Sequence, residues 1–262
     1  MSVAQVAAAG VRPADFLDLT KPRLSLLVVL SCAVGMALAP VPSPGWARGL
    51  AAIVATGAVV AGANALNCYR ERESDKWMRR TRNRPLPAGR LDPTAALAFG
   101  LVLALGGTAA LFFLQPLAGV LATIAVASYV LVYTPMKRKS SLCTLVGAVP
   151  GALPPLIGWT AAGGALDAGA WALFAWMFLW QPPHFLALAT LYREDYEAAG
   201  MPMFTVRHAN DGTVERQTIL WIAALVPVPL LLVPLSKASA KREIGRKSRR
   251  HCHGIRAAMD RS

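Results

Sequence analysis

The sequence predicts an all-α, polytopic transmembrane helix bundle. Of its 262 residues, 55% are hydrophobic and the mean hydropathy is +0.44, which is too apolar for an ordinary soluble domain. Several apolar runs approach or reach the roughly 20 residues that a helix needs to cross a bilayer. No run has Asp, Glu, Lys or Arg in its interior, as expected from the cost of charge in hydrocarbon. No connection is long enough for a soluble domain, so we expect one membrane domain.

Seven runs are candidate spans, at residues 24–39, 46–66, 94–114, 117–133, 142–160, 168–191 and 218–235. The first also resembles a secretory signal, because basic residues precede it and Ala37-Leu38-Ala39 ends it. The polar leader before it and the many later runs favour a retained helix. The last run contains Pro227, Pro229 and Pro234, which weaken it as a regular helix. We therefore divide the chain into an N-terminal segment (1–20), a transmembrane domain (21–235) and a basic tail (236–262).

The basic residues indicate an orientation. They cluster before the first run and after the second, fourth and sixth, whereas the opposite connections carry only Arg48. If every run spans, these clusters share one side, which the positive-inside rule places in the cytoplasm together with the N-terminus. A net charge of +13 distributed in this way indicates a bilayer partner and not nucleic acid. The membrane expected is the cell inner membrane.

The tail contradicts this pattern. Residues 236–262 hold nine Lys or Arg, yet alternation places them on the opposite side. Either the seventh run does not span, or the tail is foreign to the fold through a truncated or frame-shifted reading frame or a divergent end.

The stretch 64–90 contains the most suggestive polar motif. Asn67, Glu71 and Asp75 follow one another at steps of four, so one helix face would present an amide and two carboxylates. Such oxygen ligands suit Mg²⁺, which keeps substrate phosphates in its coordination shell. Arginines follow, and their fork-shaped donors suit phosphate; they are Arg79, Arg80, Arg82 and Arg84. The alternative is a solvated helix end that marks the membrane boundary.

A second acidic cluster follows the sixth run, at Tyr192-Arg193-Glu194-Asp195-Tyr196. Two adjacent carboxylates cannot face the same way on a helix, and we expect Asp195 to be the one that points at the site. Lys137, in the basic segment 133–139, is a candidate diphosphate contact, although headgroup contact explains that segment equally well. The four cysteines have no CxxC spacing, so we expect neither a zinc site nor a disulfide framework.

The sixth run contains Trp180-Gln181-Pro182-Pro183-His184-Phe185. We expect the double proline to break helical hydrogen bonding, which at membrane depth occurs inside protein or beside a cavity. His184 is either a haem contact or a polar residue satisfied within the bundle. Small residues in the fifth run, such as Gly151 and Gly158, allow close helix approach or make room for a flat ligand.

Five segments carry a family resemblance: residues 18–23 (DLTKPR), 67–89 with RTRNRPLP, 133–134, 151–159, and 180–196. Together they resemble the protohaem IX farnesyltransferases, or haem O synthases, of the UbiA superfamily of intramembrane prenyltransferases. The superfamily pattern has Asp where this chain has Glu71. The resemblance covers roughly residues 14–235 and implies nine helices around a central cavity, of which we find seven.

The resemblance implies transfer of farnesyl from farnesyl diphosphate to the 2-vinyl group of haem B, giving haem O for terminal oxidase assembly. Mg²⁺ would be held through Asn67, Glu71, Asp75 and Asp195. The diphosphate would contact Arg82, Arg84, Lys137 and Arg193, with His184 against haem. Haem A synthase or oxidase assembly proteins are implied partners. Two alternatives stay open: a sister prenyltransferase that uses 4-hydroxybenzoate, another quinone precursor or chlorophyllide, and a non-catalytic transporter or haem chaperone.

Overall fold

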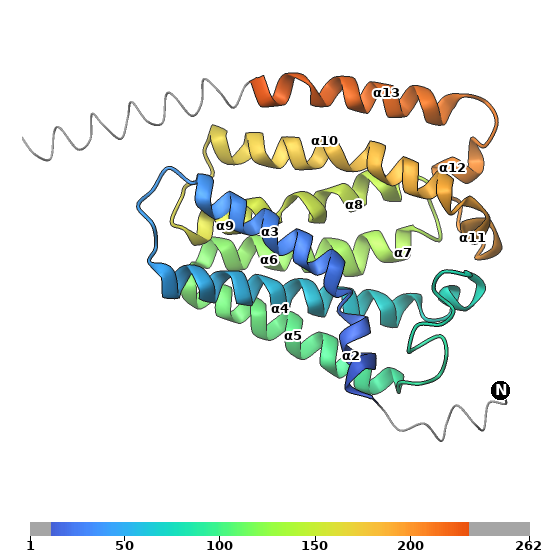
Figure 1. The fold of residues 1–262 in the computed structure, drawn as a ribbon, viewed down its shortest axis with the longest axis horizontal. Helices are drawn as coiled ribbons and strands as arrows, with labels where there is room; N and C mark the ends of the chain where they lie inside the picture. The colour runs from blue at the N-terminus through green and yellow to red at the C-terminus, as the bar shows by residue number, and fades with distance from the viewer. Residues whose placement is uncertain (1–11, 231–262) are drawn as a thin grey trace, which may run out of the picture.

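The computed structural model describes residues 12–230, which are helical throughout with short connections and contain no strand. The main helices run side by side along one direction (Figure 1). The long helices of the first half are α3 (Pro22–Leu38), α4 (Trp46–Glu71) and α5 (Pro93–Leu114). Those that follow are α6 (Pro116–Ala127), α8 (Cys143–Ala152), α9 (Pro154–Ala161), α10 (Ala168–Leu191) and α13 (Thr213–Leu225). The short elements are α2 (Pro13–Leu19), η1 (Ser74–Trp77), η2 (Ser128–Tyr133), α7 (Thr134–Met136), α11 (Arg193–Ala198) and α12 (Phe204–Arg207).

The predicted apolar runs correspond to helices in this part of the chain. Four helical stretches are long and apolar enough to cross a membrane: Trp46–Glu71, Pro93–Leu114, Pro116–Met136 and Cys143–Ala161. The pair α2 and α3, bent by 51°, makes a fifth if it is one span. By length and composition the described residues therefore give four or five spans, against the seven runs predicted.

The remaining two runs behave differently. Helix α10 has 24 residues without a charged one, but its Gln, Pro, Pro and His residues make it less apolar than the others. Helix α13 begins at Thr213, earlier than predicted, and has 13 residues. The end of the seventh run and the basic tail lie outside the described residues, as does most of the N-terminal segment.

Small residues bring the helices together. A Cβ on Gly107 of α5 would lie 2.6 Å from the carbonyl oxygen of Ala55 in α4. A Cβ on Gly158 of α9 would lie 1.9 Å from the carbonyl oxygen of Cys32 in α3. Both distances are shorter than any real contact, so these backbones approach as closely as they do because glycine is present. This confirms close helix approach as one use of the small residues predicted around Gly158.

Large apolar side chains face outward. Phe113, Val102 and Leu27 are 92%, 70% and 65% exposed. An apolar surface of this kind would be unfavourable in water and is natural against lipid.

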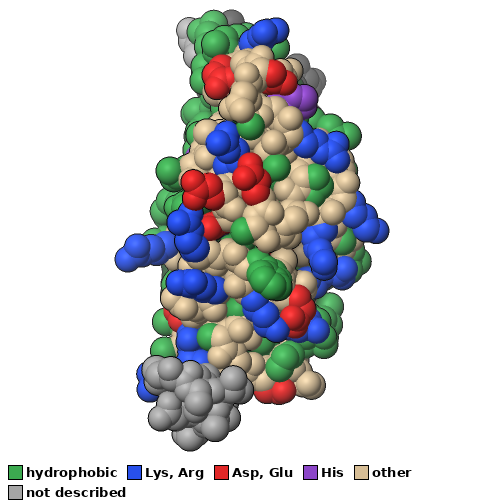
Figure 2. Space-filling model, turned by 90° about the vertical axis from the view of Figure 1, so that its right-hand side faces the viewer, with side chains coloured by type: hydrophobic (Ala, Val, Ile, Leu, Met, Phe, Trp, Pro, Cys, Tyr) green, Lys and Arg blue, Asp and Glu red, His purple; other side chains and the backbone are tan. Residues whose placement is uncertain are grey.

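One end of the bundle carries the charges. At the right of Figure 1 lie α2, the connection after α4, the end of α7, and helices α11 and α12. Seen from that end, Lys, Arg, Asp and Glu side chains are scattered across the face (Figure 2). The structure thus places the predicted basic segments at one end of the molecule, which we call the charged end.

The predicted break at the double proline is wrong. Helix α10 continues from Ala168 to Leu191 with Pro182 and Pro183 inside it. The two prolines lack the backbone donors that would reach the carbonyls of Phe178 and Leu179, yet the helix continues. Gln181 is buried, and its Nε2 donates to the carbonyl oxygens of Met177 and Ala148, both at 2.9 Å. The second of these bonds ties α10 to α8.

Candidate active site

The acidic motif lies at the charged end, but not on one helix. Helix α4 ends at Glu71, and Ser74 donates its hydroxyl to the Glu71 carbonyl at 3.0 Å. Asp75 belongs to the following 3₁₀ turn, η1. The prediction of a single helical face is therefore correct for Asn67 and Glu71 and wrong for Asp75. All three residues are nevertheless buried, being 0%, 7% and 1% exposed as whole residues.

Each of these three side chains has a cationic partner from elsewhere in the chain. Lys21 Nζ lies 2.7 Å from Asn67 Oδ1. Lys137 Nζ lies 2.8 Å from Glu71 Oε1. Arg84 donates from a guanidinium nitrogen to Asp75 Oδ2, also at 2.8 Å. Amide, carboxylates and cations therefore form a compact set in which the charges of the motif are compensated.

Lys21 is the residue that the sequence reasoning missed. It had been counted only as a basic residue before the first span. It stands between α2 and α3 with φ 49°, where the chain bends, so that its side chain reaches α4. Asn67 Nδ2 in turn donates to Thr134 Oγ1 at 3.2 Å, and Thr134 donates to the Tyr129 carbonyl at 2.8 Å. The signal available in the sequence was the position of this lysine within the DLTKPR segment.

One carboxylate oxygen of Asp75 accepts no hydrogen bond from the described residues. Its Oδ1 is buried and has no hydrogen-bond partner, in contrast to Oδ2. Burial raises the pKa of Asp75, because desolvation of the carboxylate outweighs the attraction of Arg84, and the nearby Glu71 raises it further. A buried carboxylate oxygen without a donor suits a hard cation, which prefers oxygen ligands. The residues present therefore fit a divalent metal beside Asp75.

Lys137 follows an irregular stretch of helix. A π-helical turn, η2, separates α6 from α7, and such turns are frequent at functional sites. Tyr129 and Tyr133 stack within it at 5.4 Å between ring centroids, and Lys137 Nζ lies 4.6 Å from the Tyr133 ring. Burial alone would lower the pKa of Lys137, but the Glu71 carboxylate raises it well above its usual value. The Glu71 carboxylate therefore favours the charged form of this lysine.

Asp195 is the buried member of the second cluster, as expected, whereas Glu194 is exposed. Its carboxylate accepts the backbone N–H groups of Arg79 and Arg80, at 3.2 and 3.3 Å, and a side-chain N–H of Arg79 at 3.4 Å. Desolvation opposes the charged form, but these hydrogen bonds prevail and lower the pKa of Asp195. In this structure Asp195 fastens the arginine-rich connection to α11.

The predicted metal ligands are not gathered into one cluster. Within residues 12–230 no group of three or more His, Cys, Asp or Glu side chains could hold a metal ion. Glu71 and Asp75 lie close enough to influence each other electrostatically, while Asp195 is engaged with Arg79 and Arg80. A role for Asp195 as a metal ligand stays a prediction.

The other predicted residues divide into two groups. Arg84 and Lys137 belong to the set just described. Arg82 is exposed, and Arg193 lies near its own neighbours, 3.7 Å from Glu197 and 3.5 Å from the Ala209 carbonyl. His184 is exposed and stacks on Trp180 at 4.8 Å between ring centroids, so it is not a polar residue satisfied inside the described bundle.

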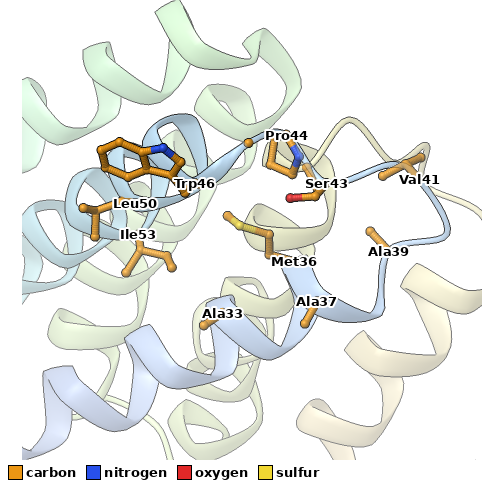
Figure 3. A pocket seen from close by; sticks show the side chains of 13 residues that line it. Ala33, Met36, Ala37, Ala39, Val41, Ser43, Pro44, Trp46, Leu50 and Ile53 are labelled. Atoms are coloured by element: carbon orange, nitrogen blue, oxygen red, sulfur yellow. The ribbon is translucent and has the colours of Figure 1, made fainter.

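A pocket of about 380 Å³ adjoins Glu71, and we call it the Arg70–Lys139 pocket. Its wall consists of Arg70, Glu71, Thr134, Pro135, Arg138, Lys139 and Met201. A larger pocket of about 460 Å³ lies between α3, the α3–α4 connection and the start of α4 (Figure 3). It is lined by residues such as Met36, Trp46 and Ile53 and by no charged side chain. It lies near Trp46, roughly 37 Å along α4 from Glu71 at 1.5 Å per residue. Acid–base and phosphate chemistry therefore belongs to the charged end.

The helical bundle and the buried acid–cation set define a multi-pass membrane protein with a charged site at one end. The model of the UbiA prenyltransferase family matches residues 28–240, and the chain belongs to this family. It is 54% identical to the protoheme IX farnesyltransferase of Anaeromyxobacter sp. (strain Fw109-5), over 86% of this chain and 75% of that protein. It is 48% identical to the protoheme IX farnesyltransferase of Myxococcus xanthus, over 86% of this chain and 76% of that protein.

Solved structures show the same fold. A UbiA homologue from Archaeoglobus fulgidus bound to DMAPP and Mg²⁺ superposes with a TM-score of 0.64 at 16% identity, over 84% of this chain and 76% of the other. A UbiA homologue from Aeropyrum pernix K1 gives a TM-score of 0.65 at 18% identity, over 86% of this chain and 90% of the other. The prediction of a UbiA-type helical bundle is confirmed.

Proposed function

We infer that this protein transfers the farnesyl group of farnesyl diphosphate to the 2-vinyl group of haem B, giving haem O. The observation that carries this inference is the buried set of Asn67, Glu71 and Asp75, each with its own cation, in a chain similar to protoheme IX farnesyltransferases. Carboxylates that attract a metal and cations that attract phosphate are both needed to bind a metal diphosphate.

We assign the metal to Asp75 and Glu71, with Asn67 beside them. Asp75 contributes Oδ1, the buried acceptor without a donor. Bound Mg²⁺ would neutralise charge on the diphosphate as it leaves. A divalent ion is in keeping with the Mg²⁺ in the A. fulgidus homologue.

The cations would receive the diphosphate oxygens. Lys137 and Arg84 are held in place by Glu71 and Asp75, so they need little reorganisation when the leaving group separates. Arg82 has an exposed side chain that is available to the outer oxygens, and Arg193 is a more distant candidate. Asp195 keeps the connection that bears Arg79, Arg80, Arg82 and Arg84 in place, besides its predicted role toward the metal.

The coupling itself needs no nucleophilic side chain. Loss of diphosphate from farnesyl diphosphate leaves an allylic cation, and the terminal carbon of the vinyl group attacks it. Water then adds to the new cation and loses a proton, which completes the hydroxyethylfarnesyl side chain. The protein must therefore position the two substrates and exclude water until that last step. His184 is proposed as a contact of the porphyrin.

The test is an assay of membranes that contain the protein, with Mg²⁺, farnesyl diphosphate and haem B. We expect haem O as the product, identified by mass spectrometry. The comparison acceptor is 4-hydroxybenzoate; a prenylated benzoate without haem O would overturn the assignment in favour of a quinone-pathway enzyme.

Asp75→Asn tests the site. The amide can still accept from Arg84 but has lost the charge that attracts a metal, so turnover should fall by about 10²–10³-fold. The matched control is Glu73→Gln, because Glu73 lies two residues from Asp75, is exposed, and among the described residues pairs with Arg72 and Lys76 alone. Equal turnover in Asp75→Asn and in the unmodified protein would contradict the assignment.

A further inference from the structure

The Arg70–Lys139 pocket carries positive charge that the rest of the described chain does not compensate. Arg70 is in the last turn of α4, and Arg138 and Lys139 follow α7. All three side chains are exposed, and none makes a hydrogen bond or ion pair within residues 12–230. The carboxylate in the wall is that of Glu71, which Lys137 already neutralises at 2.8 Å.

These cations are distinct from those that serve the acidic motif. Lys21, Lys137 and Arg84 each contact a residue of the motif, whereas Arg70, Arg138 and Lys139 point to the neighbouring pocket. The wall also has apolar parts, Pro135 and Met201. A pocket of about 380 Å³ is at the small end of the range for ligand sites, roughly 300–1,000 Å³. It therefore suits an anionic group attached to a larger apolar body that extends beyond it.

We propose that the Arg70–Lys139 pocket binds the propionate carboxylates of the haem acceptor. This proposal rests on the proposed function. Haem B is an apolar disc with two carboxylates on one edge, and placing them in hydrocarbon would be costly. The pocket offers cations at the charged end, next to Glu71. With the propionates held there, the vinyl-bearing side of the porphyrin extends away from the pocket, into the bundle.

The test compares haem B with its dimethyl ester, which has the same ring and no carboxylates. The full chain is placed in nanodiscs of phosphatidylcholine, and each porphyrin is titrated by its Soret absorbance. We expect the ester to bind on the order of tenfold more weakly than haem B, because charge-assisted hydrogen bonds are lost. In the double variant Arg138→Gln/Lys139→Gln, the affinity for haem B should fall to the affinity for the ester. The affinity for the ester should be unchanged.

Lys76→Gln is the matched control. It removes one exposed cation from the same end of the molecule, but Lys76 pairs with Glu73 and does not line the pocket. Haem B should bind to this variant as it does to the unmodified protein. Melting temperatures of all variants are measured alongside, and no change is expected because the replaced side chains are exposed.

Equal affinity for haem B and its ester in the unmodified protein would overturn the proposal, as would an equal loss for both in the double variant. If the pocket instead binds an anionic lipid headgroup, phosphatidylglycerol added to the nanodisc would occupy it. Haem B and its ester would then bind with equal affinity. Farnesylation is followed with both acceptors. If both are farnesylated with the same KM, the pocket assignment fails and the proposed function stands. If neither yields a farnesylated product, the function itself fails, and this proposal with it.

Discussion

At the scale of residues, the partners of the motif matter more than its spacing. Asn67 takes its cation from 46 positions away and Glu71 from 66 positions away. The spacing in the sequence predicted which polar side chains would face one site, but not which cations would accompany them. Such pairs depend on which helices meet, and nothing in the local sequence fixes that.

The Glu71–Lys137 pair should behave as a unit. Both side chains are largely buried, at 9% and 16% exposed, so removing one leaves an uncompensated charge. We expect Glu71→Gln or Lys137→Met alone to cost about 3–5 kcal/mol of stability, and the double variant to cost less than either. Thermal unfolding in detergent is followed with a thiol-reactive dye, because Cys32, Cys68 and Cys143 are buried probes. If the double variant lost as much stability as the two single variants together, the prediction would be contradicted.

Asp195 should make stability depend on pH in the acid range. Its folded-state pKa is lowered, so its stabilising effect is fully present above the unfolded value of about 3.9 and is lost as the pH falls through the folded value. The melting temperature of Asp195→Asn should be lower than that of the unmodified protein by a constant amount between about pH 5 and 7. The difference should shrink below about pH 4. A difference that widens toward low pH would refute the assignment.

At the scale of elements, hydropathy predicted where helices form but not where their geometry is irregular. Within residues 12–230 the apolar runs became helical because burial and internal hydrogen bonding in lipid are local requirements. The 3₁₀ turn at Asp75 and the π-helical turn before Lys137 were not predicted from that local pattern. The double proline did not end α10, in which the adjacent Gln181 donates to the Ala148 carbonyl of α8.

Adjacent glycines in α5 provide a test of close packing. A Cβ on Gly107 would meet backbone atoms of α4 at 2.6 and 2.8 Å, whereas a Cβ on Gly106 would meet nothing within 4 Å. Gly107→Ala should therefore lower the melting temperature markedly. Gly106→Ala should leave it unchanged or raise it, because alanine favours a helix over glycine by up to about 1 kcal/mol. Similar effects of the two substitutions would show that α4 and α5 do not pack as described.

At the scale of the whole molecule, the distribution of charge is asymmetric. The charged end collects the acidic motif, Asp195 and the Arg70–Lys139 pocket, whereas the pocket at the other end has no charged side chain. The positive-inside rule predicts that the charged end faces the cytoplasm.

Labelling with a membrane-impermeant maleimide tests this orientation. Asn83→Cys lies at the charged end and Ser43→Cys at the opposite end, in the connection between α3 and α4. Each is made in a Cys252→Ser background, since the other three cysteines are buried. In intact cells we expect labelling at position 43 and none at position 83, with the reverse in inverted vesicles. The opposite pattern would place the charged end outside.

The sequence by itself determined that this chain is a membrane helix bundle, and it predicted a polar motif suited to phosphate at one end. It could do so because hydrophobicity, charge and the four-residue spacing are local properties of the chain. Tertiary structure decided the rest: that Lys21 joins Asn67, that Arg84 occupies one oxygen of Asp75 and leaves the other free, and that Asp195 holds the arginine-rich connection. These contacts join segments far apart in the chain, and they form only where packed helices bring buried charges within hydrogen-bond distance.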